Sequence, residues 1–186
     1  DARIAQKRWL EISARRQYAS FERMRKHIER KYFLKYGEKC PDFTRELDEL
    51  DYLLGTIAGL QAIQNDIASQ QAVGVPTDIA PKAGAAMQCL SNEKWWGTPQ
   101  ALKAVVWSSV PGASEGKDVK GAFDKAMTLG EIKGVRLAHV MAAISAQSAD
   151  DKDRLKAIIR RFASVKDYRP SKEYRFLDEI SVSLIQ

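Results

Sequence analysis

Six basic residues recur along the first segment of the chain at spacings that bring them to one side of a helix. They are Arg8, Arg15, Arg16, Arg23, Lys26 and Arg30. Nucleic-acid binding needs a stripe of cations of this kind to neutralise phosphates. Glu11 precedes Arg15 by four positions and Glu22 precedes Lys26 by four, so we expect part of the stripe to be paired within the helix.

The net charge of +6 is unevenly placed along the chain. Residues 1–40 carry 12 Lys and Arg against 5 Asp and Glu, whereas residues 41–75 carry 1 against 6. A basic helix followed by an acidic one is what an antiparallel helix pair needs. Much of the basic excess is therefore expected to be neutralised internally rather than offered to a polyanion.

The two cysteines and two histidines limit the reactive chemistry of the chain. A disulfide between Cys40 and Cys89 would close a loop of roughly 50 residues and stabilise the fold by on the order of 4 kcal/mol; two buried free thiols are the alternative. His27 lies in a basic run and is expected in solvent, while His139 lies in an apolar run and is expected to be a hydrogen-bonded core residue. A cysteine paired with His139 as nucleophile and base is the enzymatic alternative. These residues supply too few ligands for a metal motif, and we expect neither a metal nor a cofactor.

Three of the four tryptophans lie in the single stretch SNEKWWGTPQALKAVVW. Thr98-Pro99 predicts a helix start, with Thr98 as N-cap and Pro99 at the first helical position. Trp95 and Trp96 precede this cap, where an apolar residue commonly folds back on the first turn. Because adjacent side chains point different ways, we expect one of the pair to join Trp107 in the core and the other to be exposed as a contact surface for a partner.

The element that would carry the basic stripe is a long amphipathic helix without proline. Its apolar stripe consists of Ala14, Tyr18, Phe21, Met24 or Arg25, Ile28 and Tyr32, at spacings of three and four. Roughly 30 helical residues extend about 45 Å, which calls for a partner helix alongside. Gly37 is predicted to end this helix.

The partner is predicted to be the next segment, which begins at Pro41 with acidic first turns after a short turn. Its expected apolar face consists of Phe43, Leu47, Leu50, Leu54, Ile57, Leu60 or Gln61, Gln64 and Ile67. Gly55 and Gly59 lie within it, four positions apart, and are expected to permit either a close helix approach or a bend.

Shorter helices are predicted over the rest of the chain. One opens near Pro81 and the next at Thr98. Thr128 and Glu131 have the spacing of a capping box that would start another, and Ser148 and Ser171 are the predicted caps of the last two. The segment after Thr128 is apolar nearly all round and is expected to be the central buried helix. Its apolar residues are Ile132, Val135, Leu137, Val140, Met141 and Ile144.

These patterns predict an all-α fold in which a long antiparallel N-terminal hairpin packs with a cluster of about five shorter helices. With 186 residues, 45% of them hydrophobic, the chain is expected to form a single domain over 1–186. The hairpin at 1–72 and the cluster at 77–186 form its natural subdivision. No apolar run is long enough to span a membrane.

No catalytic motif emerges, so the leading functional hypothesis is a non-enzymatic, helical protein-binding module that acts through a protein partner or through self-association as a homo-oligomer. A nucleic-acid-binding protein that uses the basic first helix is one alternative, and an enzyme with a cysteine nucleophile is another. The even number of cysteines and the start at Asp1 without Met favour a periplasmic or secreted location, with a cytoplasmic one as the alternative.

Overall fold

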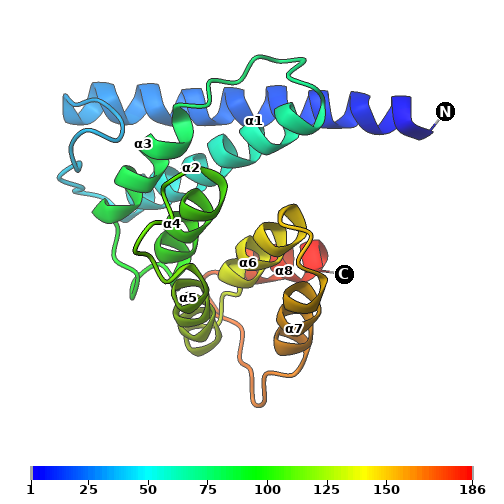
Figure 1. The fold of residues 1–186 in the computed structure, drawn as a ribbon. Coiled ribbons are helices and arrows are strands. Elements are labelled where there is room, and N and C mark those ends of the chain that lie inside the picture. Colours follow the sequence, from blue (N-terminus) through cyan, green and yellow to red (C-terminus); the bar gives the residue numbers. More distant parts are fainter. Residues whose placement is uncertain (1, 186) are drawn as a thin grey trace. The chain divides into compact units, whose positions relative to one another are not determined.

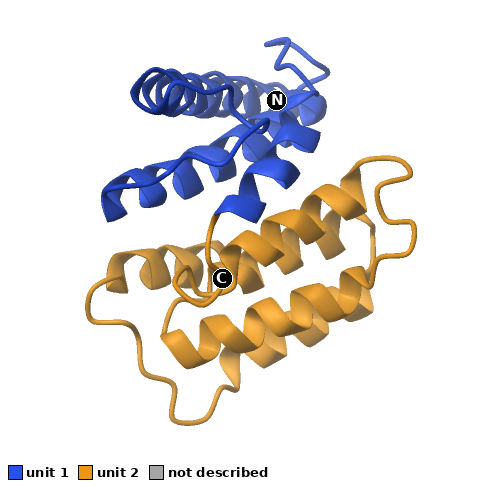
Figure 2. Ribbon diagram, turned by 90° about the vertical axis from the view of Figure 1, so that its left-hand side faces the viewer, with its two compact units in different colours: residues 1–89 blue, residues 90–186 orange. Residues whose placement is uncertain are grey.

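The computed structural model describes residues 2–185, and within them every regular element is helical. The chain divides into two compact units, residues 1–89 and residues 90–186 (Figure 2). This division lies later than the subdivision expected between 72 and 77. The third helix packs on the second, and Cys89 is bonded to Cys40, so both belong to the first unit.

The first unit is built on an antiparallel pair of helices, α1 (Ala2–Tyr32) and α2 (Glu46–Ala68), which pack along most of their length (Figure 1). Helix α3 (Ile79–Ala86) and the short 3-10 helix η1 (Met87–Cys89) follow. Polar contacts fix the register of the pair at both ends. Gln17 Nε2 donates to Gln61 Oε1 at 3.2 Å, and Lys31 Nζ donates to Asp48 Oδ2 at 2.5 Å. The predicted long hairpin is confirmed.

The apolar stripe of α1 is largely the predicted one, because Ala14, Phe21, Met24 and Ile28 are buried. Tyr18 and Tyr32 are half-buried at its edges.

The buried face of α2 differs from the predicted one at both ends, where Leu47 and Ile67 are exposed. Its interior residues are Tyr52, Leu53, Gly55, Thr56, Ile57, Gly59, Leu60 and Ile63. A Cβ atom on Gly55 would lie 2.6 Å from Met24 Cγ, and one on Gly59 would lie 2.7 Å from Phe21 Cδ2. The two glycines therefore allow a close approach to α1, and this approach sets which face of α2 is buried.

The connection between α1 and α2 is longer than predicted. Helix α1 ends at Tyr32 rather than at Gly37, and α2 begins at Glu46 rather than at Pro41. The linker is held by its own aromatic residues. Tyr36 Oη lies 2.8 Å from Thr56 Oγ1, and the Phe43 ring lies 5.3 Å from that of Tyr52 on α2. Because these side chains pack on α2, the chain leaves the helical path before the glycine.

The described residues of the second unit form five helices, four of which are arranged around a central one. They are α4 (Thr98–Ser109), α5 (Val119–Lys133), α6 (Leu137–Ser148), α7 (Lys152–Ala163) and α8 (Arg175–Ile185). Helix α6 contacts all four of the others, and its residues from Leu137 to Ala143 are buried. The prediction of a central apolar helix is confirmed, although Ile132 lies on α5 and is exposed.

The predicted start of that central helix is wrong. Thr128 lies inside α5, where its Oγ1 donates to Asp124 O at 2.9 Å. The chain breaks instead at Gly134, which adopts the left-handed conformation (φ 78°) that ends helices. Glu131, the predicted capping-box partner of Thr128, instead forms a hydrogen bond with His139 on α6.

The caps of the other helices are also displaced from their predicted positions. Gly97 caps α4, and Thr98 is its first residue. Asp151, not Ser148, caps α7 by accepting from the Arg154 N–H at 3.0 Å. Ser171 Oγ accepts a hydrogen bond at 3.2 Å from the N–H of Tyr174, which is the residue before the start of α8. At α7, an acceptor nearer to the first turn than Ser148 decides the boundary.

Candidate functional site

The six predicted cations of α1 form one exposed surface, which we call the basic face: Arg8, Arg15, Arg16, Arg23, Lys26 and Arg30. At 3.6 residues per turn they fall within an arc of about 100°, opposite the buried stripe. Arg8 and Arg30 lie about 33 Å apart along the helix axis. The helix thus presents cations along most of its length on the side that faces away from α2.

Four of these six side chains are not engaged with acidic groups within residues 2–185. Arg15 pairs with Glu11 at 2.9 Å and Lys26 with Glu22 at 3.7 Å, as predicted. Arg8, Arg16, Arg23 and Arg30 form no ion pair among the described residues. The acidic first turns of α2 neutralise Lys31 instead, through Asp48. The basic face therefore keeps most of its charge for an external partner.

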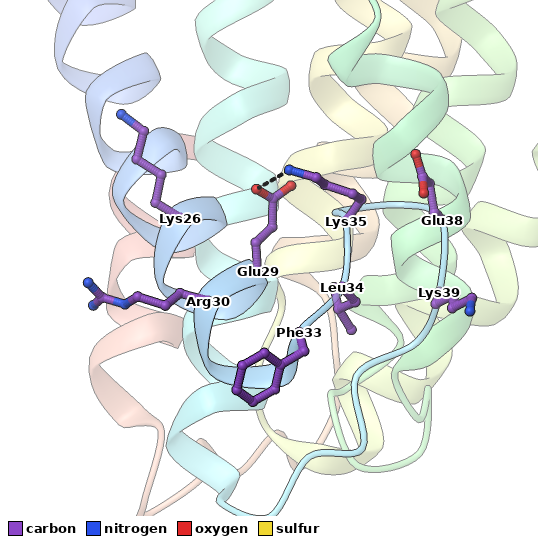
Figure 3. A pocket seen from close by; sticks show the side chains of 8 residues that line it. All are labelled: Lys26, Glu29, Arg30, Phe33, Leu34, Lys35, Glu38 and Lys39. Carbon is purple, nitrogen blue, oxygen red and sulfur yellow. Dashed lines mark ion pairs between the residues drawn. The ribbon is translucent and has the colours of Figure 1, made fainter.

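A pocket of about 590 Å³ lies at the C-terminal end of the basic face (Figure 3). It is lined by Lys26, Glu29, Arg30, Phe33, Leu34, Lys35, Glu38 and Lys39. Glu29 is already occupied: it pairs with Arg25 at 2.9 Å and Lys35 at 3.9 Å, and it accepts the Tyr36 N–H at 3.0 Å. In Figure 3 Lys35 reaches towards Glu29, whereas Arg30 and the Phe33 ring extend from the end of α1. Arg30 and Lys39 are exposed in this pocket without an acidic partner among the described residues.

Phe33 is a residue that the sequence analysis missed. Its side chain is 94% exposed, and its backbone is left-handed with φ 53°. The sequence predicts a helix that continues to Gly37, and an aromatic side chain within such a helix is ordinary. Nothing in the local sequence marks it as the residue that follows the helix end.

The prediction that one of Trp95 and Trp96 is exposed is wrong. Trp95 and Trp96 are both buried, at 0% and 3% exposure, with their rings 5.3 Å apart and Tyr174 packed against Trp96 at 4.6 Å. Trp96 has a positive φ of 53°, and Gly97 follows with 76°. This turn directs both rings into the core, so the alternation expected of adjacent side chains is lost. Neither ring is placed as an exposed contact, and Trp107, expected in the core, is only half-buried.

Cys40 and Cys89 form a disulfide, with Cα atoms 5.2 Å apart. The bond ties the linker after α1 to the end of η1, and Cys40 lies at the surface. Since neither sulfur is a free thiol, the cysteine-nucleophile alternative has no support in this state. Within residues 2–185 no group of three His, Cys, Asp or Glu side chains has the arrangement of a metal site.

His139 is fully buried on α6, as predicted for a core histidine. Its Nε2 lies 2.9 Å from Glu131 Oε1, and Arg161 Nε donates to the same oxygen at 2.6 Å. Burial lowers the pKa of His139 to about 4, against the opposing influence of Glu131. The ring is therefore neutral at pH 7, and it holds Glu131 and the α5–α6 corner in place.

This buried histidine predicts acid sensitivity. The unfolded chain binds a proton at His139 near its ordinary pKa of 6.5, whereas the folded chain does so only near 4. The neutral His139 ring therefore contributes fully to the free energy of unfolding above pH 6.5, and this free energy falls by about 3 kcal/mol as the pH drops to 4. His139→Gln is expected to flatten the pH dependence of the urea midpoint over this window. Parallel profiles for the wild type and the variant would contradict the assignment.

Comparison with protein-family models, with curated proteins and with solved structures finds no match to the chain. None of the helices described between residues 2 and 185 is long and apolar enough to cross a membrane. The basic face and the pocket at its end are therefore the features of the molecule that point to a function.

Proposed function

We propose that the chain is a non-enzymatic binding module that holds an acidic partner protein along the basic face of α1. The observation that supports this most directly is the set of four arginines on that face without acidic partners among the described residues: Arg8, Arg16, Arg23 and Arg30. Aligned, exposed cations of this kind recognise a complementary negative surface and accelerate its encounter.

Apolar side chains among the cations favour a protein over a nucleic acid. Ile12 lies within the arc of the basic face and is 37% exposed, and Trp9 lies at its edge with 66% exposure. An acidic protein surface can cover these side chains, whereas a sugar–phosphate backbone offers an isoleucine little apolar surface. Nucleic acid is the alternative partner, because the same arginines would neutralise phosphates.

The charge of the basic face also argues that its partner is a different protein. A two-fold symmetric dimer through this face would place the cations of one chain against those of the other. Self-association as a homo-oligomer would need another surface, such as the exposed Phe176 and Leu184 on α8.

The disulfide between Cys40 and Cys89 is compatible with an oxidising location. A disulfide such as Cys40–Cys89 persists where cytosolic reductants are absent. We therefore propose a periplasmic or extracellular location, with the cytoplasm as the alternative.

Reversing three arginines of the basic face tests the proposal. Arg8→Glu, Arg16→Glu and Arg23→Glu together are expected to weaken binding of a labelled 20-residue polyglutamate peptide by on the order of tenfold, because each exposed ion pair contributes modestly. Fluorescence anisotropy at 50 and 200 mM salt measures the affinity and its dependence on ionic strength. A 20-nucleotide oligothymidylate is the competing probe.

The matched control reverses Arg160, Lys166 and Lys172, three exposed cations of the second unit. Both triple variants subtract six charges from the net +6, so only the position of the charge differs. Equal losses in the two variants, or no binding of polyglutamate at 50 mM salt, would refute the proposal. Tighter binding of oligothymidylate would favour the nucleic-acid alternative.

A further inference from the structure

The helix end at Phe33 combines a strained backbone with a side chain that packs against almost nothing. Phe33 adopts a left-handed conformation (φ 53°), which glycine occupies without penalty and a bulky aromatic residue rarely adopts. The residue is nevertheless 94% exposed, so it contributes almost nothing to the core. The first unit would fold as well, or better, with glycine here. Strain held at an exposed aromatic side chain points to a role outside folding.

We propose that Phe33 is the anchor of an interaction surface that inserts its ring into an apolar pocket of an acidic partner protein. This inference rests on the proposed function, because the partner is the one held along the basic face. Aromatic side chains with little conformational entropy to lose often supply most of the free energy of such contacts.

The surroundings of Phe33 define the chemistry of the partner. Arg30 and Lys39 line the same pocket and are exposed without acidic partners among the described residues. Arg30 also belongs to the basic face, so the pocket continues that surface around the end of α1. A matching partner therefore presents an apolar depression with carboxylates at its rim, opposite Phe33 and its neighbouring cations.

A lipid surface fits this region less well. Glu38 lines the pocket itself, and Asp42 and Glu46 are exposed in the linker and at the start of α2. The carboxylate of Glu38, in the same pocket as Phe33, would be repelled by anionic headgroups, which would offset part of the attraction of the cations. A protein partner can present acidic groups to the cations and basic groups to Glu38, whereas an anionic membrane surface presents negative charge to both.

The test uses a peptide selected from a random 12-residue display library on the whole wild-type protein. Phe33→Gly removes the ring and suits the left-handed backbone, so the variant is expected to keep or raise its thermal midpoint. It should bind the synthetic selected peptide at least tenfold more weakly than the wild type. Arg30→Glu with Lys39→Glu should produce a similar loss. Ile132→Ala removes another exposed apolar side chain, on α5, and should leave the affinity unchanged.

The outcomes separate this inference from the proposed function. If Phe33→Gly binds the peptide as the wild type does while the triple variant of the basic face binds it weakly, the anchor is wrong and the basic face stands. If neither variant weakens binding, both are wrong. Vesicles of phosphatidylcholine and phosphatidylserine at 7:3 test a lipid surface as the alternative. If Phe33→Gly weakens binding to the vesicles but not to the peptide, the ring contacts a lipid surface and not a protein partner.

Discussion

Replacing Cys40 and Cys89 by serine is expected to lower the free energy of unfolding of the first unit by about 4 kcal/mol. The bond joins residues 49 positions apart, and in the chain-entropy model closing a loop of this length restricts the unfolded chain by that amount. Chemical denaturation of the double variant, compared with the wild type in the absence of reductant, measures the difference. The same loss should follow when the wild type is reduced.

Reductant provides the internal control for this prediction. It should destabilise the wild type and leave the serine variant unchanged, since that variant has no cysteine left to reduce. The disulfide also ties down the linker that supplies Phe33 and Lys39 to the pocket. Reduced protein should therefore bind the selected peptide more weakly, even where the unit stays folded. A loss of stability below about 1 kcal/mol would show that the native linker contacts, led by Tyr36, hold the unit without the bond.

The features that could be predicted from the sequence follow from helix periodicity. A side chain that recurs every three or four positions must return to the same face, so burial of Phe21 and Ile28 and exposure of Arg16 and Arg23 follow together. The candidate basic face was predictable for this reason. With only two cysteines, the sequence allowed a single possible disulfide, but it left two free thiols as the alternative.

The features that were missed depend on positive φ at residues other than glycine. Phe33 and Trp96 both adopt left-handed backbones, and neither type signals this locally. At Phe33 the turn exposes an aromatic ring, whereas at Trp96 it buries two. In both cases tertiary packing decides the conformation: the linker aromatic residues settle on α2, and Tyr174 closes over the indoles. The sequence therefore predicted an exposed tryptophan, whereas the structure buries both tryptophans and exposes Phe33.

A second missed feature is a buried ion pair between residues 42 positions apart, Arg136 and Asp178. Asp178 Oδ1 accepts from both the backbone N–H and Nε of Arg136 at 3.0 Å, and its Oδ2 accepts from Nη2 at 2.9 Å. The guanidinium lies 4.0 Å from the Phe162 ring and 3.9 Å from the Tyr168 ring. The pair thus joins α8 to the first turn of α6. No local pattern predicts a contact at this sequence separation.

Asp178→Asn is expected to destabilise the second unit by about 3–5 kcal/mol, because it leaves the guanidinium buried without its counter-charge. Burial alone would raise the pKa of Asp178, but the hydrogen bonds from Arg136 outweigh it and hold the pKa below the ordinary value of 3.8. The contribution of the pair is therefore complete above that value and is lost as the pH falls through the lowered pKa. Urea denaturation followed by the fluorescence of the buried Trp95 and Trp96 measures the change.

The comparison that isolates the buried charge lies on the same helix. Glu179→Gln breaks the exposed pair of Glu179 with Arg175, whose side chains are 57% and 72% exposed, and should change stability by less than about 0.5 kcal/mol. Arg136→Met combined with Asp178→Leu should cost less than Asp178→Asn alone, because no unpaired charge remains inside. If the double variant is instead as unstable as the sum of its single variants, the pair acts through its hydrogen bonds to the backbone at Arg136 and Phe162 rather than through its charge.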